Sequence, residues 1–148
     1  MKNGRSLLKL TVGWRWIAAV LLAVLAWPTL GIGRAAASPV DGTWVIEDLG
    51  LDLFDCQNLV CGRIVSIKDP NRRPSQCGRM IIWGLGAAGP SEWTGGSILD
   101  PNDGTTYRLS AKLQPDGALR ARIYEGIQLL GRTKILKRID LGSLTGRC

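Results

Sequence analysis

The residues best suited to chemistry are four cysteines, Cys56, Cys61, Cys77 and Cys148, in a chain of 148 residues. The chain has no histidine, which excludes Ser-His-Asp triads, Cys-His dyads and histidine-based zinc sites. The cysteine spacings also lack the C-x2-C pattern of zinc sites, so we predict disulfides and no metal. Three pairings are possible. The short spacing of Cys56 and Cys61 favours a bond at the end of a hairpin, which leaves Cys77 for Cys148.

Two other motifs carry little chemistry. Residues 84–89 match the G-x-G-x-x-G pattern of dinucleotide sites, but Pro90 and further glycines follow. These do not form the helix that a dinucleotide site needs, so we predict a loop. Asp100 and Asp103 flank a turn, where we expect their side chains to bond the local backbone rather than calcium. Because no convincing nucleophile and base are paired, we expect neither enzymatic activity nor a cofactor.

The N-terminus predicts export. It carries four basic residues and no acid, followed by an apolar run over 17–27 and by three alanines. This order is typical of a cleavable signal peptide, here over 1–37. The alternative is an uncleaved anchor over 16–33, which a proline and two glycines disfavour. We therefore expect a periplasmic or secreted protein with a single domain over 38–148.

The positive charge of the chain belongs mostly to this signal. The whole chain has a formal net charge of +7, from 19 basic and 12 acidic residues. Five of the basic residues and none of the acidic ones lie within 1–37, so the remainder carries only +2. Binding to nucleic acid depends on clustered positive charge, and we expect no nucleic-acid partner.

The clearest structural element is a hairpin over 105–124. Apolar and polar residues alternate along 105–113 and again along 119–124, which is typical of half-buried antiparallel strands. A three-residue loop at 115–117 keeps the apolar residues on one face, with Gly117 in the left-handed conformation that such loops need. The predicted pairs are Leu113 with Leu119, Ala111 with Ala121, and Leu109 with Ile123.

Six further segments have the composition of short strands and are separated by turn residues. They are 43–47, 51–54, 62–67, 80–83, 96–99 and 132–139. No segment after residue 37 has a convincing helical period. Eight short strands at close spacing predict an all-β fold, either an antiparallel barrel or a sandwich.

Several motifs resemble those of one family. They are Gly42-Thr43-Trp44, then Cys56 and Cys61 with Gly62-Arg63-Ile64-Val65, then Trp93-Thr94-Gly95-Gly96-Ser97-Ile98-Leu99-Asp100-Pro101 with Gly104 and Tyr107, and finally Gly131-Arg132-Thr133. The chain resembles the exported bacterial domain of unknown function numbered 2147, which is similar to the lipocalins. The resemblance implies a small antiparallel lipocalin-like β-barrel with a cup for apolar ligands. It also implies that Arg138, on the last strand, packs on Trp44.

The resemblance implies a fold and a compartment but no established activity, and our leading expectation is a non-enzymatic protein that binds a small apolar or amphipathic ligand. The candidate ligand-binding residues are Trp44, Trp83, Trp93, Tyr107 and Arg138. Aromatic residues of a small β domain belong mostly to the core, and some line a pocket. The alternative is a filled barrel that acts as an envelope interaction module through its loops and surface.

A basic face is the candidate surface for that alternative. Arg108, Lys112, Arg120 and Arg122 fall on one face of the predicted hairpin, with Lys112 opposite Arg120. They form either an ordinary solvated face or a docking patch for an envelope partner, such as the anionic headgroups of a lipid.

Overall fold

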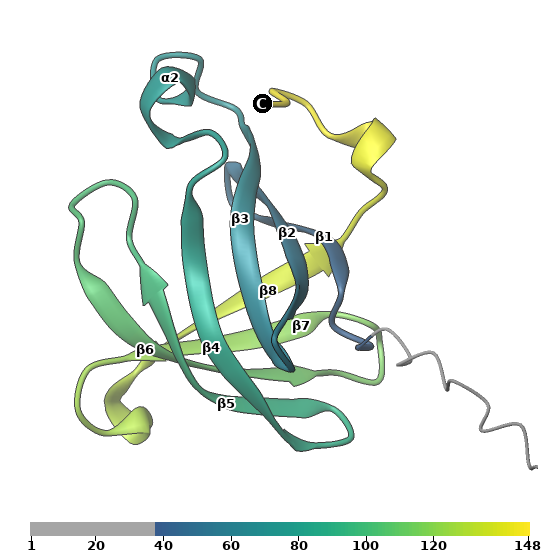
Figure 1. The fold of residues 1–148 in the computed structure, drawn as a ribbon, viewed down its shortest axis with the longest axis vertical. Helices are drawn as coiled ribbons and strands as arrows, with labels where there is room; N and C mark the ends of the chain where they lie inside the picture. Colours follow the sequence, from purple (N-terminus) through teal and green to yellow (C-terminus); the bar gives the residue numbers. More distant parts are fainter. Residues whose placement is uncertain (1–37) are drawn as a thin grey trace, which may run out of the picture. The chain divides into compact units, whose positions relative to one another are not determined.

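The structure, a computed structural model, describes residues 38–148, which form a closed barrel of eight antiparallel strands (Figure 1). Each strand pairs with the next one along the chain, and β8 pairs with β1 to close the barrel. The strands are β1 (Gly42–Ile46), β2 (Leu49–Cys56), β3 (Leu59–Ile67), β4 (Met80–Gly89), β5 (Glu92–Leu99), β6 (Thr106–Leu113), β7 (Leu119–Tyr124) and β8 (Arg132–Arg138). The predicted all-β antiparallel barrel is confirmed. The predicted signal peptide lies outside the described residues.

Among residues 38–148, three short helices lie outside the strands. They are α2 (Arg73–Gln76) between β3 and β4, η1 (Gln128–Leu130) between β7 and β8, and η2 (Leu141–Ser143) after β8. In the part of the chain that the structure describes, none of the helices is long and apolar enough to cross a membrane.

The prediction of a loop over 84–89 is wrong, because these residues belong to strand β4. Gly84 has a φ of 74° and Gly95, on the neighbouring strand β5, has a φ of 77°. Leu85 is buried over Gly96, where an added Cβ would come within 2.5 Å of the leucine Cγ. The glycines therefore let two strands bend around a buried leucine, and the motif serves the curvature of the barrel.

The predicted hairpin register is confirmed. In the β6–β7 ladder Leu113 pairs with Leu119, Ala111 with Ala121, and Leu109 with Ile123. The N–H of Gln114 donates to the carbonyl of Ala118 at 2.8 Å, which leaves a three-residue loop, and Gly117 has a φ of 82°. A slip of one residue would turn the apolar side chains to solvent, so their alternation is enough to specify the pairing.

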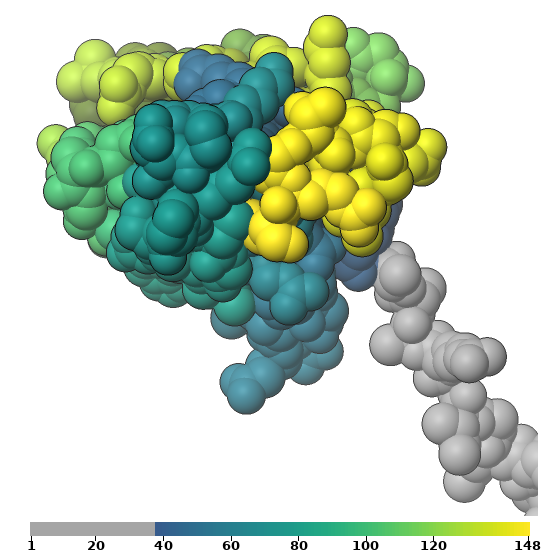
Figure 2. Space-filling model, turned by 90° about the horizontal axis from the view of Figure 1, so that it is seen from above, coloured from purple at the N-terminus to yellow at the C-terminus, as the bar shows by residue number. Residues whose placement is uncertain are grey.

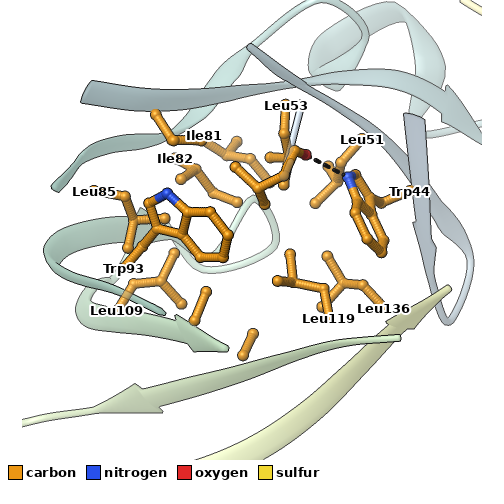
Figure 3. Packing of buried hydrophobic residues seen from close by; sticks show 14 of the residues in the cluster. Trp44, Leu51, Leu53, Ile81, Ile82, Leu85, Trp93, Leu109, Leu119 and Leu136 are labelled. Carbon is orange, nitrogen blue, oxygen red and sulfur yellow. Dashed lines mark hydrogen bonds between the residues drawn. The ribbon is translucent and has the colours of Figure 1, made fainter. Parts of the chain in front are cut away.

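Trp44 anchors the core and closes one end of the barrel. Its side chain is 0% exposed, and its Nε1–H donates to the carbonyl of Val40 at 2.8 Å. The Arg138 guanidinium lies 4.3 Å from the centroid of the ring and donates to two carbonyls of the segment 38–41. This is the contact that the family resemblance implied. Figure 3 shows Trp44 and Trp93 on opposite sides of the core, with aliphatic side chains between them.

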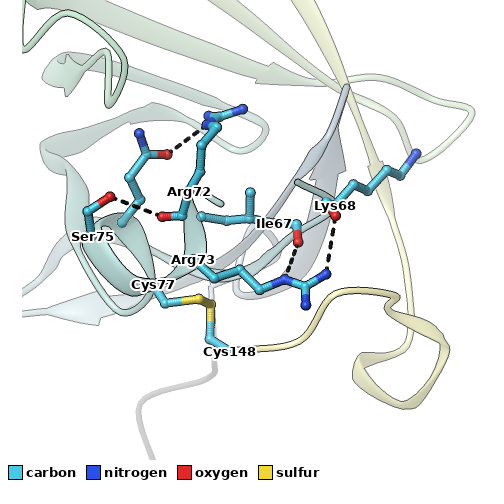
Figure 4. The surroundings of a disulfide bond; sticks show 8 residues. Ile67, Lys68, Arg72, Arg73, Ser75, Cys77 and Cys148 are labelled. Atoms are coloured by element: carbon cyan, nitrogen blue, oxygen red, sulfur yellow. Dashed lines mark hydrogen bonds between the residues drawn. A yellow bond between two sulfur atoms is a disulfide. The ribbon is translucent and has the colours of Figure 1, made fainter. Parts of the chain in front are cut away.

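Both predicted disulfides are present. Cys56 is bonded to Cys61 across the β2–β3 turn, and Cys77 is bonded to Cys148 over a sequence separation of 71 residues (Figure 4). Stable disulfides form in oxidising compartments and are rare in the cytosol. The pair of bonds therefore suggests a non-cytoplasmic, exported protein.

Residues 139–148, here called the C-terminal strap, leave β8 and cross β1 and β2 to reach β3. The first N–H of the strap donates to a carbonyl of β1 at 3.0 Å, and Leu144 is buried against Gly50 of β2. The N–H of Cys148 donates to a carbonyl of β3 at 2.9 Å. The disulfide to Cys77 then fixes the end of the strap next to the α2 segment, and Figure 2 shows the two side by side.

Candidate functional site

One end of the barrel opens into a cavity of about 180 Å³. Residues from the β1–β2 turn, the β3–β4 connection and the β5–β6 turn border it. These connections lie at the same end of the barrel because successive strands alternate in direction. We call this end the mouth. The opposite, closed end carries the β2–β3, β4–β5 and β6–β7 turns.

The walls of the cavity are apolar. Aliphatic side chains from several strands line it, among them Leu51, Leu53, Ile82, Leu85, Leu109 and Leu136. Ala111 and Ala121 also line it, and they are paired directly across β6 and β7. The nearest pairs on the same, inner face of this ladder are larger, being leucine with isoleucine on one side and leucine with leucine on the other. The two alanines therefore leave space that larger side chains would fill.

Charged side chains surround the mouth. Arg72, in the β3–β4 connection, forms an ion pair with Asp48, and its Nε–H donates to Oε1 of Gln76 at 3.1 Å. The Nη2 atom of this arginine is buried and has no hydrogen-bond partner among residues 38–148. Lys134 forms an ion pair with Glu47 across the same opening. An apolar cup with a charged rim suits a ligand that has one apolar end and one polar end.

The structure disperses the five predicted ligand-binding residues. Tyr107 lines the cavity. Trp44 and Trp93, which are 0% and 3% exposed, fill the core outside the cavity lining, and Arg138 covers Trp44 at the closed end. Trp83 is 39% exposed and does not border the cavity. Side chains alternate along a strand, and because the preceding residue of β4 points into the core, Trp83 points outward.

Most of the cavity residues were not among the predicted site residues, for two different reasons. Ala111 and Ala121 stood on the predicted inner face of the hairpin, and their small size was a signal that went unused. The rim gave no such signal. Arg72 and Asp48 are 24 residues apart and come from different connections, so only the closure of the barrel brings them together.

The turn that contains Asp100 and Asp103 behaves as predicted. Oδ1 of Asp100 accepts the N–H of Asn102 at 2.9 Å, and Oδ1 of Asp103 accepts the N–H of Thr105 at 2.7 Å. Both carboxylates thus bond the backbone of their own turn. Within residues 38–148 there is no group of three or more cysteine, aspartate or glutamate side chains placed to hold a metal ion.

The predicted basic face lies on the outside of the barrel, but its four cations differ in their contacts. Lys112 pairs with Arg120 in the ladder, as predicted, and forms an ion pair with Glu92 at 2.5 Å. Arg122 is half-buried, and its Nε–H donates to the carbonyl of residue 128 at 2.8 Å. It also donates to the carbonyl of residue 129 and to the hydroxyl of residue 133. Arg108 and Arg120 remain exposed.

Replacing Arg122 by alanine is expected to loosen the β7–β8 connection without unfolding the barrel. The guanidinium satisfies two carbonyls of η1, and no other side chain replaces it in the described structure. Hydrogen bonds to a charged donor contribute about 1.5–3 kcal/mol. Hydrogen exchange should therefore become roughly tenfold or more faster at residues 128–131 and stay unchanged in β2 and β3. Unchanged exchange at 128–131 would contradict this role. An Arg120→Ala variant, which removes an exposed cation from the same strand, is the matched control.

Comparisons with known proteins agree with the fold described above. A family described as "Uncharacterized protein conserved in bacteria (DUF2147)" matches residues 42–138. Among solved structures, the chain is similar to HP1028 from the human pathogen Helicobacter pylori, which is described as belonging to the lipocalin family. The two are 18% identical, with a TM-score of 0.57 over 69% of this chain and 84% of that one, which shows a shared fold. A search of curated proteins found no match.

Proposed function

The chain belongs to the DUF2147 family, and from this premise we propose that it is an exported, non-enzymatic protein that binds a small apolar or amphipathic ligand in its barrel. The observation that carries the proposal is the apolar cavity with a charged mouth. The lipocalin-like fold supports it, because an eight-stranded barrel is just wide enough to hold one small ligand.

The volume of the cavity limits the ligand to a small molecule or to one end of a larger one. An engineered cavity of about 150 Å³ lined by aliphatic and aromatic side chains binds benzene. A cavity of about 180 Å³ has room for a single ring or a short hydrocarbon chain. The aliphatic walls favour burial of the apolar end. The polar end then lies at the mouth, near Arg72 and Lys134.

Export is part of the proposal. The signal-peptide pattern over 1–37 and the two disulfides support a periplasmic or secreted location. In that location a protein with an open cup encounters amphipathic molecules of the cell envelope.

Replacing Ala111 by phenylalanine is expected to abolish ligand binding while the barrel still folds. The new ring points into the cavity opposite Ala121 and fills it. Octanoate and 1-octanol serve as amphipathic probes, and binding is measured as a rise in melting temperature. A ligand at about 100 times its Kd stabilises the folded state by about 2.7 kcal/mol. In a domain of this size that free energy raises the melting temperature by roughly 10 °C.

An Ala88→Phe variant is the matched control, because this alanine is exposed on β4. It should keep the full shift in melting temperature, whereas Ala111→Phe should melt cooperatively and show no shift. Native and denaturing masses of the protein recovered from cells provide an independent measurement, since a natural ligand adds mass that denaturation removes. Ligand binding is refuted if the unmodified protein shows no shift with either probe and carries no added mass.

A further inference from the structure

The connection between β7 and β8 exposes three large apolar side chains. Ile127 is 61% exposed, Leu129 is 82% exposed and Leu130 is 78% exposed. The connection, yellow-green in Figure 1, stands out beside β6. Large exposed apolar patches are uncommon on soluble monomers and mark sites that contact a membrane, another protein or a ligand.

These side chains are presented by an ordered turn. Arg122 donates to two carbonyls of η1, and Nε2 of Gln128 donates to Oγ of Ser110, a buried residue on the outer side of β6. The chain then enters β8 after Gly131, which lies close to β7. A Cβ atom at residue 131 would lie 2.7 Å from the carbonyl oxygen of Ile123, so the path requires glycine. These hydrogen bonds fix the turn to the barrel, and its two leucine side chains point to solvent.

Basic residues surround the apolar turn on the outer side of β6, β7 and β8. Ile135, which is 49% exposed, pairs with Arg120 in the ladder, and Lys137 lies two residues further on the same side of β8. Arg108 is exposed on β6. Residues 105–138 hold two acidic residues, Asp116 in the β6–β7 turn and Glu125 at the start of the apolar turn, and Glu92 of β5 is already paired with Lys112. The result is a group of exposed apolar side chains bordered by an excess of positive charge.

We propose that this surface, made of Ile127, Leu129, Leu130, Ile135, Arg108, Arg120 and Lys137, docks on an anionic lipid bilayer. Leucine and isoleucine side chains insert at the boundary between headgroups and acyl chains, while arginine and lysine contact anionic headgroups. A second copy of the chain fits the same surface poorly. A two-fold dimer would bring the surface against itself and place cations against cations.

Vesicle binding tests this proposal directly. Vesicles that contain phosphatidylglycerol are compared with vesicles of phosphatidylcholine alone, at low and high salt, by co-sedimentation of the purified protein. We expect at least about tenfold tighter binding to the anionic vesicles, reduced by salt. The Leu129→Ser/Leu130→Ser variant should bind the anionic vesicles at least about tenfold more weakly. The Arg120→Glu variant should also bind these vesicles more weakly.

The matched control is Leu141→Ser, which removes a leucine that is 47% exposed in η2, outside this surface. It should bind vesicles as the unmodified protein does. All variants are compared in the same processed form, established by intact mass, so that the N-terminal segment contributes equally. The proposal is overturned if the anionic vesicles are not preferred or if the serine variant binds like the control. It is also overturned if light scattering shows a dimer that the two serines convert to a monomer.

Discussion

Replacing Cys77 and Cys148 together by serine is expected to lower the free energy of unfolding by about 4 kcal/mol in the chain-entropy account of disulfides. The bond closes a loop with a sequence separation of 71 residues, and it removes a correspondingly large number of conformations from the unfolded chain. Losing the bond also releases the end of the C-terminal strap from the α2 segment. Guanidinium unfolding, followed by tryptophan fluorescence, measures the change.

The second disulfide provides the matched control. Cys56 and Cys61 are separated by only 5 residues, so replacing both by serine should cost about 2 kcal/mol on the same account. The order of the two losses tests the argument. Equal losses, or a larger loss for the short loop, would show that strain or residual structure in the unfolded chain dominates.

Replacing Trp44 by alanine is expected to lower the free energy of unfolding by about 3–5 kcal/mol. The side chain is 0% exposed, and truncation leaves a cavity at the closed end of the barrel. The change also leaves the carbonyl of Val40 without its donor and removes the ring beneath the Arg138 guanidinium. Denaturant unfolding or calorimetry of the variant measures the loss.

Two substitutions separate these contributions. Trp44→Phe keeps most of the apolar contact but has no N–H for Val40, and we expect a smaller loss of about 1–2 kcal/mol. Trp83→Ala removes the same side chain from a position that is 39% exposed, and we expect a loss below about 2 kcal/mol. A Trp44→Ala loss no larger than that of Trp83→Ala would contradict the anchoring role of Trp44.

The fold was predictable from the sequence where local patterns determine the geometry. The alternation around Ala111 and Ala121 was enough to specify the β6–β7 register, because a one-residue slip exchanges the two faces. The glycines of residues 84–89 led to the wrong prediction of a loop, because glycine has a low strand propensity. Gly84 and Gly95 adopt left-handed conformations within paired strands, so they bend β4 and β5 without ending them.

The candidate site was less predictable, because it depends on volume and on contacts distant in sequence. The tryptophans were predicted to line a pocket because aromatic residues often do so, but Trp83 lies on the outer surface and Trp93 fills the core. The cavity instead arises where two alanines meet, a property of the assembled ladder. Likewise, Arg122 was predicted to belong to the exposed basic face. Its guanidinium instead donates to two carbonyls of the β7–β8 connection, whose path the sequence does not specify.

The C-terminal strap spans the weakest junction of the barrel, the seam between β1 and β8, and this affects the solubility of the protein. These strands share two residue pairs, whereas β2 and β3 share eight. A barrel that opened at the seam would become a curved sheet with two free edges, and free edges recruit strands from other chains into aggregates. The strap joins β8 to β3 across β1 and β2, and a disulfide fixes its far end. We therefore expect the disulfide between Cys77 and Cys148 to keep both edges paired and to limit self-association of the protein.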